Sequence, residues 1–466
     1  MTRLVGMERL WRRYCPHPLD RAAVAVLLVL CLLTALLLAG GDHSRPRVQR
    51  FSWQERVVGA QDKAFILTFN RPMDTRTVEQ HLRMTPELPG KVSWAGRRLA
   101  YTLKEPIPYG REYELHLAAA KDKYGRGEVM EPFQGRFRTR DQAFIYIGTQ
   151  GEETGRLVLH NFTQGTHQVL TPADLQVLDA QPLPQADRVV LSAQKQGDPA
   201  LEVQLYTVTT GLQYATPDGT PPPRAAGQVA TLLPSEGFQN LKFDLAPAGD
   251  KLVVARASLH NSAQSGLWQV DLQGGRRPLH LALAGDFRVT PDGQNLVMAQ
   301  GEGLALLPLQ PQAEPLDFLP KFGQLLNFDR QGTRALMVKF NSDFTRSLFL
   351  VGGTGEQELL RLRGSILSAD FDPRRPWVYV IATEAGEATN YQELPYLAAI
   401  AVPTKQILPL LRLEEPALPH IALAPDGRDL LLEVNGHLWR FPLGANPLGQ
   451  LPEDLGLWGR QPRWLF

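Results

Sequence analysis

The chain has 466 residues, of which 43% are hydrophobic and 21% are charged. This usage is ordinary for a globular protein, and it excludes a disordered chain, a collagen and a coiled coil. Two cysteines cannot build a disulfide framework. The 40 glycines and 37 prolines indicate many turns. At about 150 residues per domain, the length suggests about three units.

An apolar run without a charge covers residues 22–41, AAVAVLLVLCLLTALLLAGG. A helix of about 20 residues spans about 30 Å, the thickness of the hydrocarbon core of a bilayer. We therefore predict one transmembrane helix over 22–41, with a cytoplasmic tail over 1–21 and a linker over 42–52. A cleaved signal peptide is the alternative, because small residues end the run.

Charge sets the predicted orientation and argues against one class of partner. Five arginines precede the run, and four follow it before residue 57. This slight excess favours an N-terminus inside, with the bulk of the chain in the periplasm or outside a bacterial cell. Residues 141–466 hold 25 Lys and Arg against 34 Asp and Glu. This acidic balance argues against nucleic acid as a partner.

Short alternating segments separated by turn signals fill residues 53–140. The pattern predicts strands over residues 65–69, 91–94, 99–103, 112–117 and 135–139. Strands at this spacing over about 90 residues favour a β-sandwich. Pro72 should end strand pairing because it cannot donate to a ladder, and Asp74 should accept from nearby backbone amides.

This segment resembles the bacterial Ig-like modules of S-layer-associated proteins. Phe69–Asp74 is close to their F-S-x-P-M-D signature, with Asn70 in the place of the usual Ser. Pro108–Tyr113 is similar to their L-x-x-G-x-x-Y segment, Asp122–Gly125 to their D-x-x-G turn, and Phe137–Thr139 to their closing F-x-T. The resemblance implies a spacer or interaction module and no enzyme.

A repeated pattern covers residues 141–466: an apolar strand, a turn that often reads Pro-Asp-Gly, and a second apolar strand. The six copies have their turns near residues 184–187, 247–250, 291–294, 330–333, 373–376 and 425–428. Successive copies are 39 to 63 residues apart. Repeats of this length with several strands each predict a β-propeller.

The repeat resembles the TolB-type periplasmic propellers. Residues 144–170 read as a blade without its first strand, and Arg463–Phe466 is an apolar strand without a partner of its own. We predict that this C-terminal strand completes the N-terminal blade and closes a ring of seven blades; six blades are the alternative. The predicted fold class is thus an all-β exported region, an Ig-like sandwich followed by a propeller, behind one N-terminal transmembrane helix.

The loops of the propeller differ in length between its two faces. The turns between first and second strands are tight, whereas five of the loops between second and third strands are long, at 149–156, 194–200, 257–266, 340–347 and 383–395. Recognition usually resides in loops carried by a rigid scaffold. The predicted partner-binding residues are Glu152, Glu153, His260, Asn261, Asp343, Phe344, Glu387, Asn390 and Tyr391. The alternative is that these loops are merely tolerated insertions.

Motifs of catalysis and metal binding are absent from the sequence. It contains no H-E-x-x-H, G-x-S-x-G, Walker A loop, G-x-G-x-x-G or EF-hand loop. Asp370 and Asp372 are two apart on a predicted strand, so they could share a face and bind a cation in a central channel. The simpler interpretation is that an Asp there caps the turn before Pro373. We predict no catalytic residue, no cofactor and no metal.

The favoured function is a membrane-anchored extracytoplasmic scaffold whose propeller docks a protein or peptide through the face with long loops. The alternative is a protein that binds or senses a cell-wall glycan or a small ligand. A metal-dependent propeller hydrolase is a weaker third hypothesis. The chain is predicted not to be an enzyme.

Overall fold

The computed structural model describes most of the chain. The described residues are 18–40, 45–124, 129–197, 202–213, 222–310, 314–385, 393–413, 417–444 and 447–466. They are mostly β-strand, with two α-helices. Two compact units are present, one of residues 1–49, 69–82 and 117–133 and the other of residues 50–68, 83–116 and 134–466.

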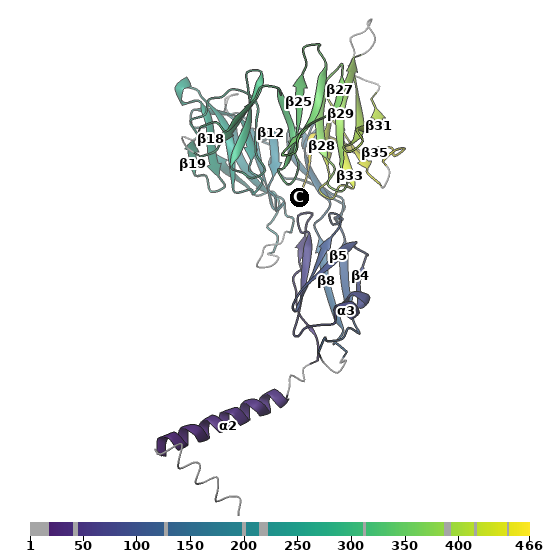
Figure 1. Cartoon of the computed structure of the whole chain (residues 1–466). Helices are drawn as coiled ribbons and strands as arrows, with labels where there is room; N and C mark the ends of the chain where they lie inside the picture. Colours follow the sequence, from purple (N-terminus) through teal and green to yellow (C-terminus); the bar gives the residue numbers. More distant parts are fainter. Residues whose placement is uncertain are drawn as a thin grey trace, which may run out of the picture. The chain divides into compact units, whose positions relative to one another are not determined.

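The apolar N-terminal run forms helix α2 (Pro18–Gly40; Figure 1). Within the described residues, no helix is both long enough and apolar enough to cross a membrane. The transmembrane helix predicted over residues 22–41 is therefore not confirmed.

Two four-stranded sheets are built from residues 48–139. The first has the order β1-β3-β6-β5, with β1 (Val48–Phe51), β3 (Ala64–Phe69), β5 (Gly90–Ala95) and β6 (Arg98–Leu103). The second has the order β2-β8-β7-β4, with β2 (Val57–Val58), β4 (Leu82–Thr85), β7 (Glu112–Leu117) and β8 (Phe133–Thr139). Each strand predicted in this part of the sequence is present, with ends that shift by at most two residues.

Aromatic side chains join the two sheets. Phe65 of β3 stacks on Tyr101 of β6 at 5.0 Å between ring centroids, and Tyr113 of β7 stacks on Phe137 of β8 at 5.2 Å. Trp53 contacts Phe65 at 5.3 Å and Phe137 at 5.0 Å. The outward positions of β3 and β7 alternate with these buried ones, which is the period of two that the sequence displayed.

The prediction overlooked a short helix, α3 (Thr75–His81). It begins directly after Asp74, whose carboxylate accepts hydrogen bonds from the amides of Arg76 at 3.0 Å and Thr77 at 3.3 Å. The predicted amide-accepting role of Asp74 is thus confirmed, and the acceptor serves as a helix N-cap. Strand β3 ends at Phe69, before Pro72, as predicted.

Five further sheets have four antiparallel strands in chain order. They are β12 (Leu175–Pro182), β13 (Arg188–Lys195), β14 (Gln204–Thr209) and β15 (Val229–Leu233); β16 (Phe238–Leu245), β17 (Lys251–Ser258), β18 (Gly266–Asp271) and β19 (Arg276–Pro278); β20 (Phe287–Val289), β21 (Asn295–Gln300), β22 (Gly303–Pro308) and β23 (Asp317–Leu319); β24 (Gln324–Phe328), β25 (Arg334–Phe340), β26 (Arg346–Gly352) and β27 (Gly355–Leu362); and β28 (Ile366–Phe371), β29 (Trp377–Ala385), β30 (Glu393–Ala401) and β31 (Gln406–Arg412).

A seven-stranded sheet joins the two ends of the repeat region. Its order is β11 (Thr166–Val169), β10 (Leu157–Asn161), β9 (Ala143–Gly148), β35 (Glu453–Trp464), β34 (His437–Pro442), β33 (Asp429–Val434) and β32 (His420–Leu423). The first half of β35 pairs with β34, and the second half pairs with β9 through Trp464 and Phe144. The predicted pairing of the C-terminal strand with the N-terminal blade is confirmed. With β35 counted in both halves, the described strands make seven blades.

The turns between first and second strands lie where the repeat predicted them, and aspartates organise them. Asp292 accepts from the amide of Gln294 at 2.9 Å, in a turn that contains Pro-Asp-Gly. The fourth copy lacks the proline. There Asp329, two positions earlier in the repeat, accepts from the amide of Thr333 at 2.8 Å and from Arg334 Nε at 2.9 Å. The turn is retained in this copy because an aspartate at another position of the repeat accepts from its backbone amides.

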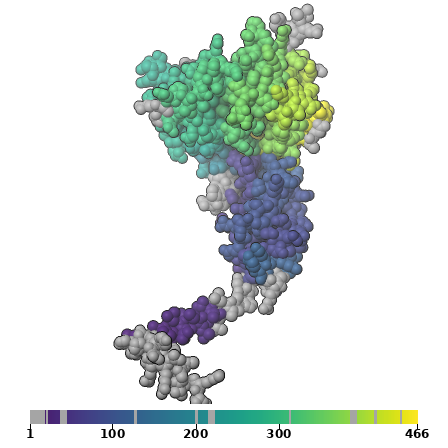
Figure 2. All heavy atoms as spheres, viewed as in Figure 1, coloured from purple at the N-terminus to yellow at the C-terminus, as the bar shows by residue number. Residues whose placement is uncertain are grey.

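The blades pack through apolar clusters between neighbouring sheets. One cluster joins β9 and β10 to β12 and β13, and another joins β24–β27 to β28–β30. Inner strands of neighbouring blades touch in the pairs β16 with β20, β24 with β28, β28 with β32, β32 with β35 and β35 with β12. These strands therefore surround a common centre. Figure 2 shows the blades, from teal to yellow, as a continuous packed surface.

Candidate functional site

A β-bulge recurs in the innermost strands and decides which side chains face the centre of the propeller. The pairing register skips one residue in each of four first strands: Leu178 in β12, Leu241 in β16, Leu326 in β24 and Leu367 in β28. Strand β35 skips two residues before Arg463. An extra residue re-aims the side chains that follow it. Of the polar residues directly after the skips, Asn327, Ser368 and Arg463 line a central cavity.

Polar side chains two positions further along bind the next blade. Gln181 of β12 accepts from the amide of Leu245 at 3.1 Å and donates to the carbonyl of Phe243 at 3.2 Å. Asp244 of β16 accepts from the amide of Val289 at 2.6 Å. Such hydrogen bonds satisfy backbone groups that the inner edge of a blade would otherwise leave unpaired. They form latches from blade to blade.

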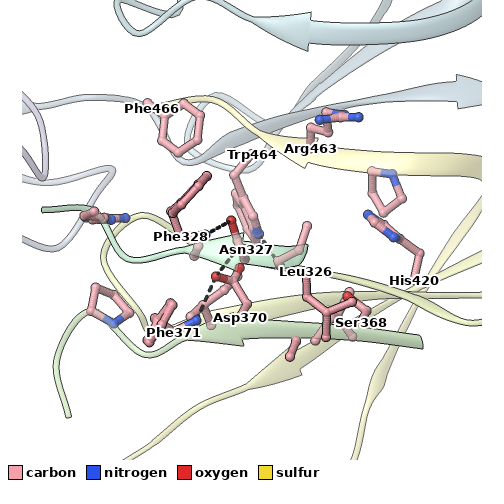
Figure 3. Close-up of a pocket in the computed structure, with 18 of the residues that line it drawn as sticks. Leu326, Asn327, Phe328, Ser368, Asp370, Phe371, His420, Arg463, Trp464 and Phe466 are labelled. Atoms are coloured by element: carbon pink, nitrogen blue, oxygen red, sulfur yellow. Dashed lines mark hydrogen bonds between the residues drawn. The ribbon is translucent and has the colours of Figure 1, made fainter. Parts of the chain in front are cut away.

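The central cavity has a volume of about 340 Å³ and is lined mainly by inner-strand residues. Figure 3 shows the rings of Phe328, Phe371 and Phe466 toward one side of the view and the side chains of Arg463 and His420 toward the other. Trp464 Nε1 donates to the carbonyl of Ala422 at 2.9 Å, which holds the indole in place. The cavity thus combines aromatic and basic groups.

Charged groups in the cavity are unevenly placed. Its lining contains Arg288, Arg330, Arg463 and His420 against one carboxylate, that of Asp370. Burial, followed by the positive charges of Arg463 and Arg288, lowers the pKa of His420 to about 4. His420 is therefore neutral near pH 7. The cavity is positively charged chiefly through its arginines.

Asp370 is held by the protein rather than directed at a cation. Its Oδ1 accepts from Asn327 Nδ2 at 3.0 Å and from the amide of Phe371 at 2.8 Å (dashed in Figure 3). Burial raises its pKa to about 6, although the amide of Phe371 and the charge of Arg330 oppose that shift. These partners make Asp370 another latch between β24 and β28.

The alternative in which Asp370 and Asp372 share a strand face and hold a cation is not supported. Asp372 lies beyond the end of β28, in the turn before the next strand. Its carboxylate accepts from the amide of Arg374 at 2.7 Å and from Arg375 Nε at 2.7 Å. The turn-capping interpretation is confirmed. Among the described residues, no three His, Cys, Asp or Glu side chains are grouped to hold a metal.

Two of the predicted face loops form short 3₁₀ helices. Glu152 and Glu153 lie in η1 (Gly151–Glu153), where Glu153 accepts from the Tyr146 hydroxyl at 3.0 Å and also contacts His167. His260 and Asn261 precede η2 (Ser262–Gln264), and the Asn261 side chain accepts from the amide of Ala263 at 3.0 Å. Glu153 and Asn261 thus serve local structure, while Glu152 and His260 are exposed.

The third loop, between β25 and β26, displays an aromatic ring. Phe344 is 93% exposed, and its backbone lies in the left-handed region at φ +61°. Beside it, Asp343 accepts from Thr345 Oγ1 at 2.6 Å and from Arg361 Nη2 at 2.7 Å. The Thr345 hydroxyl and amide, followed by Arg361, lower the pKa of Asp343 to about 2. The loop is therefore held in one conformation.

A smaller cavity lies near the start of this loop, between the blades of β20–β23 and β24–β27. Its volume is about 210 Å³, and its lining includes Phe287, Val297, Leu325 and Phe340. Phe340 ends β25 and is 56% exposed. Asp286, Arg288 and Gln324 also line it, so the cavity combines apolar and polar groups. Such a cavity beside an exposed ring is a surface on which a partner could bury area.

Glu387, Asn390 and Tyr391 lie outside the described residues. The sequence interpretation missed the basic residues of the central cavity, because they come from strands far apart in the chain. One signal was present in the sequence. A leucine is followed by a polar residue in four first strands, as Leu178-Asp179, Leu241-Lys242, Leu326-Asn327 and Leu367-Ser368.

Comparison with known proteins gives structural likenesses at low sequence identity. No family model matches the chain. No curated protein matches it. The chain is similar to the structure of TolB from Acinetobacter baumannii, at 11% identity and a TM-score of 0.38, over 81% of this chain and 82% of that one. It is also similar to oligogalacturonate lyase from Vibrio parahaemolyticus, at 12% identity and a TM-score of 0.43, over 63% of this chain and 86% of that one.

TolB is therefore among the solved structures that resemble the chain, as the sequence resemblance predicted. The resemblance of residues 53–140 to bacterial Ig-like modules is not confirmed by these comparisons.

Proposed function

We propose that the protein is a binding scaffold whose propeller docks a protein or peptide partner through the face that carries the β9–β10, β17–β18 and β25–β26 loops. The observation that carries the proposal is the placement of Phe344. The left-handed φ of Phe344 costs about 1–2 kcal/mol of conformational free energy. Because its ring stays in water, folding gives it no hydrophobic stabilisation in return. A ring held rigidly in this way is suited to bury itself in a partner.

The cavity beside Phe340 supports the same face. It lies where β20 and β24 begin and where β21 and β25 end, so it opens on the side of the β25–β26 loop. A partner that covers Phe344 could also place an apolar side chain against Phe340 and Leu325. Aromatic anchors next to apolar pockets are typical of the few residues that contribute most to binding.

The test places a photo-reactive phenylalanine analogue at position 344 of the full chain and irradiates intact cells. The crosslinked partner is identified by mass spectrometry, purified, and measured against the wild-type chain. We expect Phe344→Ser to weaken binding at least tenfold, as loss of an aromatic anchor does. Its melting temperature should stay unchanged, since the side chain is exposed.

Phe318→Ser is the matched control, because Phe318 is also an exposed ring, at 49%, but lies in the outermost strand β23. This variant should bind as the wild type does. Equal binding by Phe344→Ser and the wild type would refute docking through this face.

We further propose that the chain works outside the cytoplasm and is not an enzyme. The location is supported by the apolar run over 22–41 and by the lack of cysteine from residue 42 onward. A reporter enzyme that is active only outside the cytoplasm, fused after residue 466, should be active. Carbonate extraction of the membrane fraction should separate an anchored chain from a released one.

A further inference from the structure

The arginines of the central cavity have unused hydrogen-bonding capacity. Arg463 Nη2 donates to Asp179 at 3.1 Å, while its buried Nε has no partner. Arg288 makes neither a hydrogen bond nor an ion pair within the described part of the chain, and it is exposed to the cavity. The buried Nε of Arg463 without an acceptor is unfavourable unless a ligand supplies one. The guanidinium of Arg288 is open to solvent, so its donors are available to an anionic ligand.

The nearest carboxylates do not fill this role. Asp244 and Asp370 attract Arg288 electrostatically. However, Asp244 accepts from the amide of Val289, and Asp370 accepts from Asn327 and the amide of Phe371. Burial also raises the pKa of both carboxyls, which reflects the cost of their charge there. They lower the positive potential around Arg288 but accept no hydrogen bond from its guanidinium.

Arg288 and Arg463 exert their electrostatic effects on the same two side chains. Both lower the pKa of His420, and both act on the carboxyl of Asp244. They come from β20 and β35, which are far apart in the chain, and they line one cavity. Two convergent guanidiniums are the usual receptor for a carboxylate or phosphate, which they can bind with paired hydrogen bonds.

The rest of the lining selects among anions. Asp179, Asp244 and Asp370 surround the two arginines, so the site suits one negative charge better than two. The rings of Phe328, Phe371, Trp464 and Phe466 give the same cavity an apolar part. Its volume of about 340 Å³ is at the small end of ligand pockets.

We propose that the central cavity binds a small organic carboxylate, with the carboxylate between Arg288 and Arg463 and an apolar or ring-shaped body against the aromatic side chains. This site lies in the central cavity. Arg288 also lines the smaller cavity beside Phe340, whereas Arg463 lines the central cavity.

The test is calorimetric titration of the purified full chain with 3-phenylpropionate. Its amide, 3-phenylpropanamide, has the same shape without the charge, and inorganic phosphate has the charge without the ring. We expect 3-phenylpropionate to bind at least tenfold more tightly than either, since a hydrogen bond to a charged group contributes about 1.5–3 kcal/mol.

Arg288→Gln should weaken 3-phenylpropionate about tenfold. Its melting temperature should change little, because the Arg288 side chain makes no hydrogen bond or ion pair with the described residues and loses only its longer-range attraction to Asp244 and Asp370. Arg277→Gln is the control, since Arg277 is exposed in the outermost strand β19, and it should bind as the wild type does. Phe344→Ser should also keep full binding, which separates this proposal from partner docking.

Three results would overturn the proposal. The first is that the wild-type chain binds none of the three probes at millimolar concentration. The second is that the amide binds as well as the carboxylate, which would indicate an apolar cavity only. The third is that phosphate binds while 3-phenylpropionate does not, which would indicate a phosphate site.

Discussion

Individual polar side chains in the centre of the propeller differ in whether the protein already uses their hydrogen-bonding groups. Gln181 and Asp244 accept from backbone amides of the next blade, and Asp370 accepts from the Asn327 side chain of the preceding blade, so they stabilise the ring. Arg288 has no such contact. Residues that line the channel therefore fall into two groups. Those whose hydrogen-bonding groups are already used by the protein stabilise the fold, and those whose donors are unused are the candidates for ligand binding.

Asp244 tests the role of the latches in stability. Asp244→Ala leaves the buried amide of Val289 without its acceptor, which costs about 1–3 kcal/mol of unfolding free energy. Asp244→Asn keeps an oxygen for that amide and removes a buried charge, so it should cost less. Chemical denaturation of the three proteins at pH 7 measures this order. Equal stability of the alanine variant and the wild type would contradict the latch.

His420 predicts how stability changes with acid. Its pKa in the folded protein, about 4, lies below its ordinary value of 6.5. Its contribution to stability is therefore complete above about pH 6.5 and is lost as the pH falls through 4. The groups that face it are Arg463, Arg288 and Asp179. Asp370 acts in the opposite sense, since its pKa is raised to about 6 and protonation relieves the cost of its burial.

The comparison of His420→Gln with the wild type isolates the histidine. Between pH 7 and 4.5 the variant should lose less unfolding free energy than the wild type, as measured by denaturation at each pH. Parallel curves for the two proteins would show that the pKa of His420 is not lowered in the folded protein.

At the scale of elements, the sequence predicted strands and their closure better than it predicted irregular features. Alternation located β3, β6 and β7 to within a residue, and the lone apolar strand at the C-terminus predicted the pairing of β35 with β9. Helix α3 was missed because seven residues carry little periodicity. The bulges were missed because one extra residue in a strand leaves the alternation of apolar and polar residues in place on both sides and only shifts it by one position. The basic cavity depends on those bulges, so it could not be predicted either.

Closure by β35 predicts a specific pattern of destabilisation. Trp464 is 3% exposed and packs against Phe144 at 5.8 Å between centroids. Trp464→Ala should cost about 3–5 kcal/mol, whereas Phe466→Ala, at a position that is 39% exposed, should cost much less. Deletion of residues 459–466 should unfold the propeller cooperatively. Unchanged melting of the deletion variant would contradict closure.

At the scale of the whole propeller, the two faces differ in the length of the connections that they carry. Turns between first and second strands are short and stabilised by aspartates such as Asp292 and Asp329. The connections between second and third strands include the loop that displays Phe344 and two loops with 3₁₀ turns. This difference between the faces is the reason why we propose that the long loops carry recognition.

Hydrogen exchange of the full chain, with and without the partner found by crosslinking at position 344, tests partner docking most directly. The account predicts slower exchange on binding in residues 257–266 and 340–347 and no change in the turns at 184–187, 247–250 and 291–294. Protection confined to those turns, with the β25–β26 loop unchanged, would contradict it.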